Sequence, residues 1–353
     1  MVDLWFFLVG AMFAAYVVLD GYDLGAGIVS PFVGRADGER RAVLDTILPY
    51  WDGNEVFLVA GGATLYLAFP RLFPAFVSGF YLPVMIVLWL LALRGIAIEM
   101  RHKLDHPLWN QLWDGGFFFA SLLLVLFFGA ALGNVVRGVS VEENGEFFAP
   151  LWTNFRVANE VGILDWYTLL VGATAVTVVA RHGALRIAAR VKDPVVAERS
   201  KRLAAALGPV AIGLAAIATV ATFNVQPHVQ KSLGDKPWAG IVGLVAFGGL
   251  VASWILGRRK EPKDRERAYW ASSASLASLI ACACIGVHPY GMLARVPERS
   301  VLATAAAADS YAMSIGLAWW IPGMALVVAS IVFVHKTIER AKAKEAATLQ
   351  AKD

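Results

Sequence analysis

The sequence has little charge and almost no cysteine. Asp, Glu, Lys and Arg make up 16% of the 353 residues and the formal net charge is +4, whereas soluble domains carry about 25% charged residues. We therefore expect no nucleic-acid partner. The only two cysteines, Cys282 and Cys284, are two residues apart and point to different faces of a helix, which argues against a disulfide or a metal pair. No glycine-rich nucleotide-binding loop is present, and the chain start lacks the basic region of a cleavable signal peptide.

Hydrophobic residues, in contrast, are abundant and occur in long runs. They form 58% of the chain, which includes 12 Trp and 20 Phe, and aromatic residues are typical of membrane interfaces. A helix needs about 20 apolar residues to cross a bilayer. Nine such runs lie at residues 4–29, 49–69, 76–100, 115–136, 161–180, 203–223, 238–256, 271–286 and 311–334. The sequence therefore predicts an all-α polytopic membrane protein with nine transmembrane helices.

The basic residues predict the orientation of these helices. Of the 31 Lys and Arg, 23 lie after the first, third, fifth and seventh runs and in the C-terminal tail, seven lie on the opposite side, and Arg94 lies inside a run. Loops rich in Lys and Arg remain in the cytoplasm. We therefore expect the N-terminus to be periplasmic and the C-terminus to be cytoplasmic.

Carboxylates interrupt the first two runs. Asp20 and Asp23 lie in the first, and Asp52 and Glu55 open the second. A carboxylate in a spanning helix costs about 2.5–3.5 kcal/mol on insertion scales and typically marks a proton or ion path. Asp20 and Asp23 are three residues apart, which places them on one helix face. We expect Asp23 at the cytoplasmic end of its helix, where a negative charge is unfavourable and needs compensation.

The acids at the ends of runs also have structural interpretations. Asp52 and Glu55 have the spacing of a capping box. Asp114, which opens the fourth run, could be an N-cap. Glu99, which ends the third run, could pair with Lys103 one turn later. The alternative is that all of these acids belong to a path from the cytoplasmic side.

The acids divide the chain unequally. All six of them lie in the first third, and the later runs contain no acid deep in an apolar stretch. We therefore distinguish residues 1–140, the first four transmembrane helices with the acidic motifs, from a five-helix scaffold half at 141–335 and a cytoplasmic tail at 336–353. Gly21 and Gly25 form a small-xxx-small face that allows another helix to approach the acids closely.

Histidines that could bind haem are not evident. Helical bundles hold haem through axial His residues from facing helices. The six histidines, His102, His106, His182, His228, His288 and His335, all fall in expected loops or at the ends of runs, with His288 expected to be the deepest. We therefore expect no redox centre in this chain.

Short motifs in the first 140 residues point to a family. They are Leu19-Asp20-Gly21-Tyr22-Asp23-Leu24-Gly25, Trp51-Asp52-Gly53-Asn54, Ala60-Gly61-Gly62-Ala63, Ser78-Gly79-Phe80-Tyr81, the stretch from Arg94 to Arg101, Trp113-Asp114-Gly115 and Gly133-Asn134. With them the chain resembles subunit II of the cytochrome bd-type quinol oxidases. Beyond residue 140 the resemblance is looser but collinear.

The resemblance implies a terminal oxidase in the bacterial cytoplasmic (inner) membrane. Such a complex oxidises ubiquinol or menaquinol and reduces dioxygen to water, with haem b and haem d (or a b-type substitute) in its partner, subunit I. Subunit II would then hold no haem, support subunit I and conduct cytoplasmic protons to the oxygen-reduction site. The resemblance also allows for a bound quinone, for small single-helix subunits and for contact with lipid and quinol.

The resemblance further implies roles for single residues. The acid matching Asp52 begins the proton path, the acid matching Glu99 continues it, and the one matching Asp23 is essential to the complex. We add Glu55 and Asp20 to the path because of their positions. The other motif residues are Trp51, Gly53, Asn54, Arg94 and Asp114. Many family members have Gln at the position of Glu55, so here Asp52 and Glu55 are expected to titrate as a coupled pair and either could carry the proton.

Two other functions fit part of the sequence. A proton-coupled secondary transporter also uses intramembrane acids, but such proteins usually contain matching broken helices in two halves, and no second Asp-Gly-x-Asp element follows residue 140. A purely structural assembly subunit would make every acid a cap or a packing group. The oxidase subunit accounts for more of the sequence than either.

We predict that the chain expressed without its partner binds no haem, because it lacks paired ligands in mid-membrane. It should purify colourless or be degraded, which a reduced-minus-oxidised spectrum of the purified fraction will show. Stoichiometric haem in the isolated chain would contradict this prediction.

Overall fold

The structure is a computed structural model that describes residues 1–143, 146–158, 160–259 and 261–350, and it is almost entirely helical. Its helices are α1 (Val2–Val33), α2 (Asp37–Leu44), α3 (Trp51–Ala68), α4 (Leu72–Gly79), α5 (Tyr81–Met100), α6 (Pro107–Arg137), α7 (Trp166–Arg190), α8 (Pro194–Val225), α9 (Pro227–Gly234), α10 (Ala239–Arg258), α11 (Pro262–Val287), α12 (Ala303–Ala306) and α13 (Ser310–Gln350). Two short strands, β1 (Tyr290–Met292) and β2 (Val301–Leu302), pair antiparallel. Residues 351–353 of the predicted tail lie outside the described residues.

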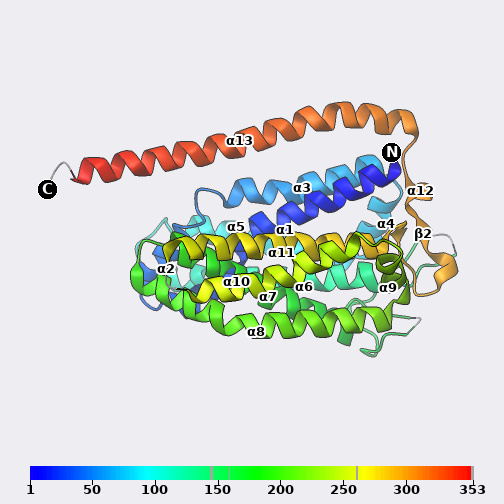
Figure 1. The fold of residues 1–353 in the computed structure, drawn as a ribbon, viewed down its shortest axis with the longest axis horizontal. Helices are drawn as coiled ribbons and strands as arrows, with labels where there is room; N and C mark the ends of the chain where they lie inside the picture. Colours follow the sequence, from blue (N-terminus) through cyan, green and yellow to red (C-terminus); the bar gives the residue numbers. More distant parts are fainter. Residues whose placement is uncertain (144–145, 159, 260, 351–353) are drawn as a thin grey trace. The chain divides into compact units, whose positions relative to one another are not determined.

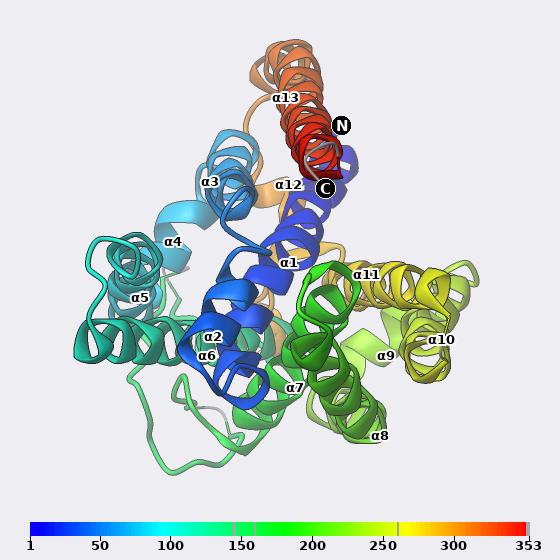
Figure 2. The same cartoon turned by 90° about the vertical axis from the view of Figure 1, so that its left-hand side faces the viewer.

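Residues Val2–Ala307 form one compact unit, and α13 belongs to a second unit that begins at Ala308. Within the first unit the long helices run side by side along a common direction (Figure 1). The end-on view follows α1 through this bundle, where it contacts α3, α6, α7 and α11 (Figure 2). The acid-bearing helix α1 therefore touches helices from both the N-terminal and the C-terminal part of the chain.

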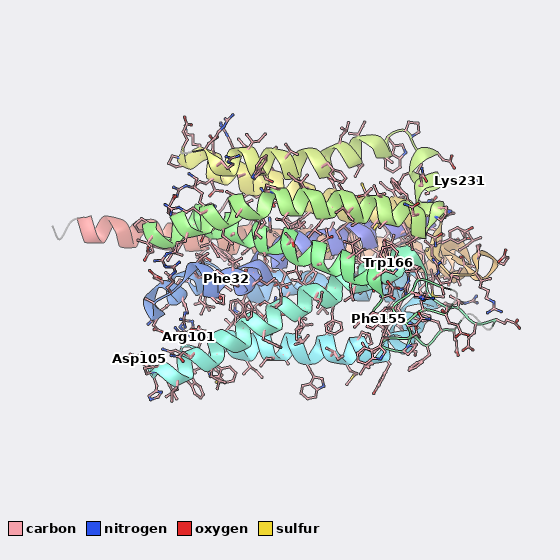
Figure 3. All side chains as sticks on the ribbon, turned by 90° about the horizontal axis from the view of Figure 1, so that it is seen from below. Phe32, Arg101, Asp105, Phe155, Trp166 and Lys231 are labelled. Carbon is pink, nitrogen blue, oxygen red and sulfur yellow. The ribbon has the colours of Figure 1, made fainter. Side chains whose placement is uncertain are left out.

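The loops at the two ends of the bundle are predicted to lie on opposite sides of the membrane. Arg101 and Asp105, from the loop after α5, lie at one end, and Phe155, Trp166 and Lys231 lie at the opposite end (Figure 3). Consecutive long helices joined in this way place alternate loops at opposite ends of the bundle.

Eight helices in the described part of the chain are long and apolar enough to cross a membrane. They are α1, α5, α6, α7, α8, α10, α11 and residues Ser310–Val334 of α13. They coincide with eight of the nine predicted runs. The remaining run, 49–69, forms α3, which is less apolar because Asp52, Asn54 and Glu55 lie in its first turns. The structure is thus all-α, with eight candidate membrane-spanning helices.

Local sequence signals determine where several helices begin. Proline is the first residue of α6, α8, α9 and α11, a position at which its missing N–H costs no hydrogen bond. Asp165 caps α7 by accepting from the backbone N–H groups of Tyr167 and Thr168, at 2.8 and 2.9 Å. Asp193 caps α8 in the same manner. Each such cap contributes about 1 kcal/mol.

Two glycines allow α1 and α7 to cross in backbone contact. A Cβ atom on Gly25 would lie 2.2 Å from the carbonyl oxygen of Val179, and one on Gly183 would lie 2.3 Å from the carbonyl carbon of Gly25. This confirms the predicted close approach at Gly25. At Gly21 the nearest atom, in the His182 ring, is 4.0 Å away, so the crossing point lies one turn further along α1.

We predict that Gly25→Ala lowers the free energy of unfolding by about 1–3 kcal/mol, because the added methyl group has no space at the crossing. Gly213→Ala in α8 is the matched control, since an added Cβ there meets no atom within 4 Å. Thermal unfolding of the detergent-purified protein compares the two. Equal melting temperatures for both variants and the wild type would show that the crossing tolerates a methyl group.

Candidate functional site

The interior of the bundle contains an arginine bound to a carboxylate. Arg94 of α5 donates from Nη1 to both carboxylate oxygens of Asp20 in α1, at 2.8 and 2.7 Å. Both side chains have 0% exposure. Nη2 lies 3.1 Å from Oε2 of Glu55 in α3, an ion pair without hydrogen-bond geometry. Arg94 therefore joins three helices through charge.

Asp23 lies beside this pair and is bound by an amide. Asn54 of α3 donates through Nδ2 to Asp23 Oδ2 at 2.7 Å and to the Tyr22 hydroxyl at 2.8 Å. Asp23 has 0% exposure, and its Oδ1 has no hydrogen-bond partner among the described residues. Asp23 lies ten residues before Val33, where α1 ends, so its expected place at a helix end is wrong. Burial, and not the helix terminus, is the reason that its charge needs compensation.

The acids at the start of α3 become more buried along the helix. Asp52 is exposed, and Glu55, one turn later, is half-buried beside Arg94. Asp52 is the second residue of α3, and the N-cap residue Tyr50 makes no side-chain cap hydrogen bond, so the capping-box interpretation is wrong. Gly53 lies next to Asp52 with open space around it.

Trp51 of α3 and Glu99 of α5 are the remaining predicted site residues on these two helices. A Cβ atom on Gly95 would lie 3.5 Å from the Trp51 ring, which therefore covers the residue next to Arg94. Glu99 is exposed, one residue before the end of α5. No ion pair joins it to Lys103 in the described structure, which removes the pairing that its spacing suggested.

Asp114 belongs to a different cluster at the end of the bundle that holds Arg101. Arg101 donates to Asp114 at 2.8 Å and to Asp37 at 2.6 Å, and Arg40 donates to Asp114 at 3.3 Å. The helix α6 begins at Pro107, so Asp114 lies in its second turn and the N-cap interpretation is wrong. Asp114 instead links α2, α5 and α6.

At the same end of the bundle, Glu39 of α2 is bound by backbone N–H groups and by an arginine. Glu39 accepts from the backbone N–H groups of Arg35 and Ala36 and from the Arg199 guanidinium of α8. The backbone hydrogen bonds, with a further contribution from Arg199, lower the pKa of Glu39 to about 2. This carboxylate therefore stays ionised at neutral pH and fastens α2 to α8.

Four buried side chains near Asp23 had no predicted role there. One is Tyr22 of α1 itself, and the others come from neighbouring helices: His182 and Arg186 of α7, and Tyr269 of α11. His182 was expected at the end of a run, but α7 continues to Arg190 and His182 has 0% exposure. Among the histidines whose side chains the structure describes, His182 and not His288 is therefore the most buried. Arg186 is four residues after His182 and so lies on the same helix face. The four-residue spacing of His182 and Arg186 was the sequence signal from which their shared helix face could have been predicted, had α7 been extended to Arg190.

Both nitrogens of His182 have partners. Nε2 lies 3.2 Å from the backbone oxygen of Val18, and Nδ1 lies 3.0 Å from the Ser272 hydroxyl. Because a carbonyl oxygen only accepts, Nε2 carries the proton and Nδ1 accepts from Ser272. His182 is thus committed to joining α1, α7 and α11. No group of three or more His, Cys, Asp or Glu in the described residues is arranged to hold a metal ion.

A large apolar cavity adjoins the part of α1 that carries Asp20 and Asp23. It has a volume of about 570 Å³, and α1, α6, α7, α8, α9, α10 and α11 line it. Tyr16, one turn before Asp20, lies on its wall together with Phe128 of α6. The cavity and the buried acids are therefore separated by little more than one turn of α1.

We predict that Arg94→Leu destabilises the protein by about 3–5 kcal/mol, because it leaves Asp20 as an unpaired buried charge. The double variant Arg94→Leu with Asp20→Leu should recover most of that loss. Yield and melting temperature of the solubilised protein provide the measurement, with Arg202→Leu, an exposed arginine of α8, as control. If the single and double variants are equally stable, the pair contributes nothing to the fold.

Comparison with known proteins assigns the chain to a family. It is 27% identical over 314 residues to "Cytochrome bd ubiquinol oxidase subunit 2" of Bacillus subtilis (strain 168), covering 89% of this chain and 88% of that protein. It is 28% identical over 313 residues to "Cytochrome bd-I ubiquinol oxidase subunit 2" of Escherichia coli (strain K12), covering 82% and 81%. Its fold is that of a chain in the structure of bd oxidase from Geobacillus thermodenitrificans, with a TM-score of 0.74 at 16% identity over 96% of this chain and 98% of that one. The family model described as "Cytochrome bd terminal oxidase subunit II" matches residues 1–338, and the chain therefore belongs to this family of multi-pass membrane proteins and is a subunit of a cytochrome bd oxidase.

Proposed function

We propose that the chain is the haem-free subunit II of a respiratory quinol:oxygen oxidoreductase, in which it supports the haem-bearing subunit I and conducts cytoplasmic protons towards the oxygen-reduction site. The names of the Bacillus subtilis and Escherichia coli relatives specify a ubiquinol oxidase. Haem b and haem d, or a b-type substitute, would be held by subunit I. Small single-helix subunits, quinol and lipid are further expected partners.

The proposed topology has nine spans in the bacterial cytoplasmic membrane. In it α3 crosses the membrane with the eight apolar helices, the N-terminus is periplasmic and the C-terminus is cytoplasmic. The basic-residue count supports this orientation, and so does the separation of Arg101 and Asp105 from Trp166 and Lys231 at opposite ends of the bundle (Figure 3). The end with Arg101 would then face the cytoplasm.

The observation that carries the proposed proton path is a graded row of carboxylates. Asp52 is exposed, Glu55 is half-buried one turn later in α3, and Asp20 is fully buried on the other side of Arg94. Asp52 and Glu55 are three residues apart in α3. Glu55 and Asp20 both lie beside the guanidinium group of Arg94. Groups that can take and release protons, arranged from the surface inwards, are what a proton relay requires.

Glu99 completes the proposed path, and Asp23 lies next to it. Glu99 is exposed on α5 at the end of the bundle that also holds Arg101, where it could pass protons on to the partner subunit. An exposed acid on a membrane helix needs a polar or protein environment, which a covering subunit I would supply. Asp23, bound to Asn54, lies at the buried end of the row.

The apolar cavity is the proposed place for a bound quinone. Its volume of about 570 Å³ and its aliphatic and aromatic walls suit an isoprenoid chain, while Tyr167, Thr219 and Thr222 offer hydroxyl groups at its side. The three proposed segments of the chain have different roles. Residues 1–140 contain the row of acids, the helices of 141–335 form most of the cavity, and the tail at 336–353 is cytoplasmic.

We predict that Asp52→Asn slows quinol oxidase turnover at least about tenfold, which corresponds to about 1.4 kcal/mol on the limiting step. Asparagine keeps the shape of aspartate but cannot relay a proton. The double variant Asp52→Asn with Glu55→Gln should be slower still, since Glu55 offers a parallel entry. Turnover per haem and proton uptake are measured with the assembled complex in proteoliposomes, and haem content should remain near normal.

Asp105→Asn is the matched control, because Asp105 is an exposed carboxylate at the same end of the bundle and is not part of the row. It should turn over at the wild-type rate. If Asp52→Asn and the double variant also keep wild-type turnover and proton uptake, the entrance is elsewhere.

A further inference from the structure

Arg186 of α7 packs against two tyrosine rings in the bundle interior. Its guanidinium carbon is 4.9 Å from the centre of the Tyr22 ring and 4.8 Å from that of the Tyr269 ring. Arg186 is 7% exposed, and its Nε has no hydrogen-bond partner among the described residues. None of the ion pairs found in the described residues includes it, so its charge is met by aromatic faces.

One of these rings connects Arg186 to Asp23. The Tyr22 hydroxyl accepts from Asn54 Nδ2, and the same amide donates to Asp23 Oδ2. Asp23 and Arg186 are thus the two charged ends of a short chain of contacts through Asn54 and Tyr22. Each end also has a polar atom without a hydrogen-bond partner, Oδ1 of Asp23 and Nε of Arg186.

The position of Arg186 is set by its neighbours on α7 and α11. His182, one turn earlier, stacks on Tyr269 with the ring centres 4.9 Å apart. It is tied to Val18 and Ser272 by its two nitrogens. Because His182 holds Tyr269 and Tyr269 in turn faces Arg186, the guanidinium is held against the rings of Tyr22 and Tyr269.

The other charges near Asp23 are already engaged. Arg94 is bound to Asp20 and lies beside Glu55, so one cation faces two carboxylates there. On α7, Arg181 donates to the Ser253 hydroxyl of α10. The remaining titratable groups that face this region are Tyr16, Tyr22, His182, Glu266 and Tyr269. Arg94 and Arg186 are the two cations that act on Asp23, and of these two only Arg186 has no carboxylate partner of its own among the described residues.

We propose that Arg186 is the counter-charge of Asp23, a positioning residue that acts through Tyr22 and Asn54 to stabilise the ionised carboxylate inside the membrane. In the low dielectric of the bundle an opposite charge nearby favours the carboxylate form. The further consequence, that Arg186 sets the alkaline limit of oxidase turnover, rests on the proposed proton path. The balance of charge between Arg186 and Asp23 does not depend on that path.

The test follows the protonated Asp23 carboxyl group by infrared spectroscopy of the assembled oxidase over a range of pH. Asp23→Glu identifies the band, since it keeps a carboxyl group but shifts its C=O stretch. In Arg186→Gln the band of the protonated acid should persist to a pH about one unit higher than in the wild type. Arg186→Lys should restore most of the wild-type behaviour because it restores the charge. The alkaline limit of turnover should move in the same direction.

Arg181→Gln is the matched control, because it removes another buried arginine of α7 that binds Ser253 instead. It should leave the carboxyl band unchanged. An unchanged band in Arg186→Gln, or an equal change in Arg181→Gln, would overturn the proposal. If Arg186→Gln does not assemble, combining it with Asp23→Asn decides the question: recovery of the complex supports paired charges, and continued loss shows that Arg186 only fills space.

These outcomes are separable from a failure of the proposed proton path. That failure appears as wild-type turnover in Asp52→Asn. Failure of the charge balance appears in the infrared band of Asp23, which does not depend on turnover.

Discussion

The structure depends on the cost of placing charge inside a membrane bundle. Removing one member of a buried ion pair costs about 3–5 kcal/mol, because the other is left without compensation. Arg94 meets this constraint by binding Asp20 on α1 while lying 3.1 Å from Glu55 on α3. The pairing therefore decides how α1, α3 and α5 face one another. It also keeps titratable groups in a place where lipid alone would exclude them.

A second constraint, backbone contact between α1 and α7, brings the C-terminal part of the chain to the acids. Gly25 and Gly183 leave no space for a side chain at the crossing. Because α7 is held this close, His182 reaches the backbone of Val18 and Arg186 reaches the ring of Tyr22. The chemistry around Asp23 is thus shared between helices that are far apart in sequence, although every acid of the row comes from the first 140 residues.

Much of this arrangement was predictable. Long apolar runs indicate spanning helices wherever the apolar stretch is unbroken, which explains eight of the nine runs, and α3 differs because its first turns are polar. Helix ends were harder to predict. The helices α6 and α7 extend beyond their apolar runs to Pro107 and Arg190, because the backbone hydrogen bonds of a helix do not require apolar side chains. That extension moved Asp114 and His182 into helix interiors and removed the capping interpretation of Asp114.

The sequence by itself determined the all-α membrane class, the family resemblance and the presence of acids in the first helices, since composition, run length and short motifs are local properties. The tertiary structure alone decided which charges meet. Arg94 is 74 residues from Asp20, and Arg186 is likewise remote from Tyr22 and Tyr269 in sequence. A contact of this kind depends on how helices rotate and cross, and that is set by packing at positions such as Gly25 and Gly183. Spacing within one helix predicts which residues share a face, but only the packed bundle determines what that face meets.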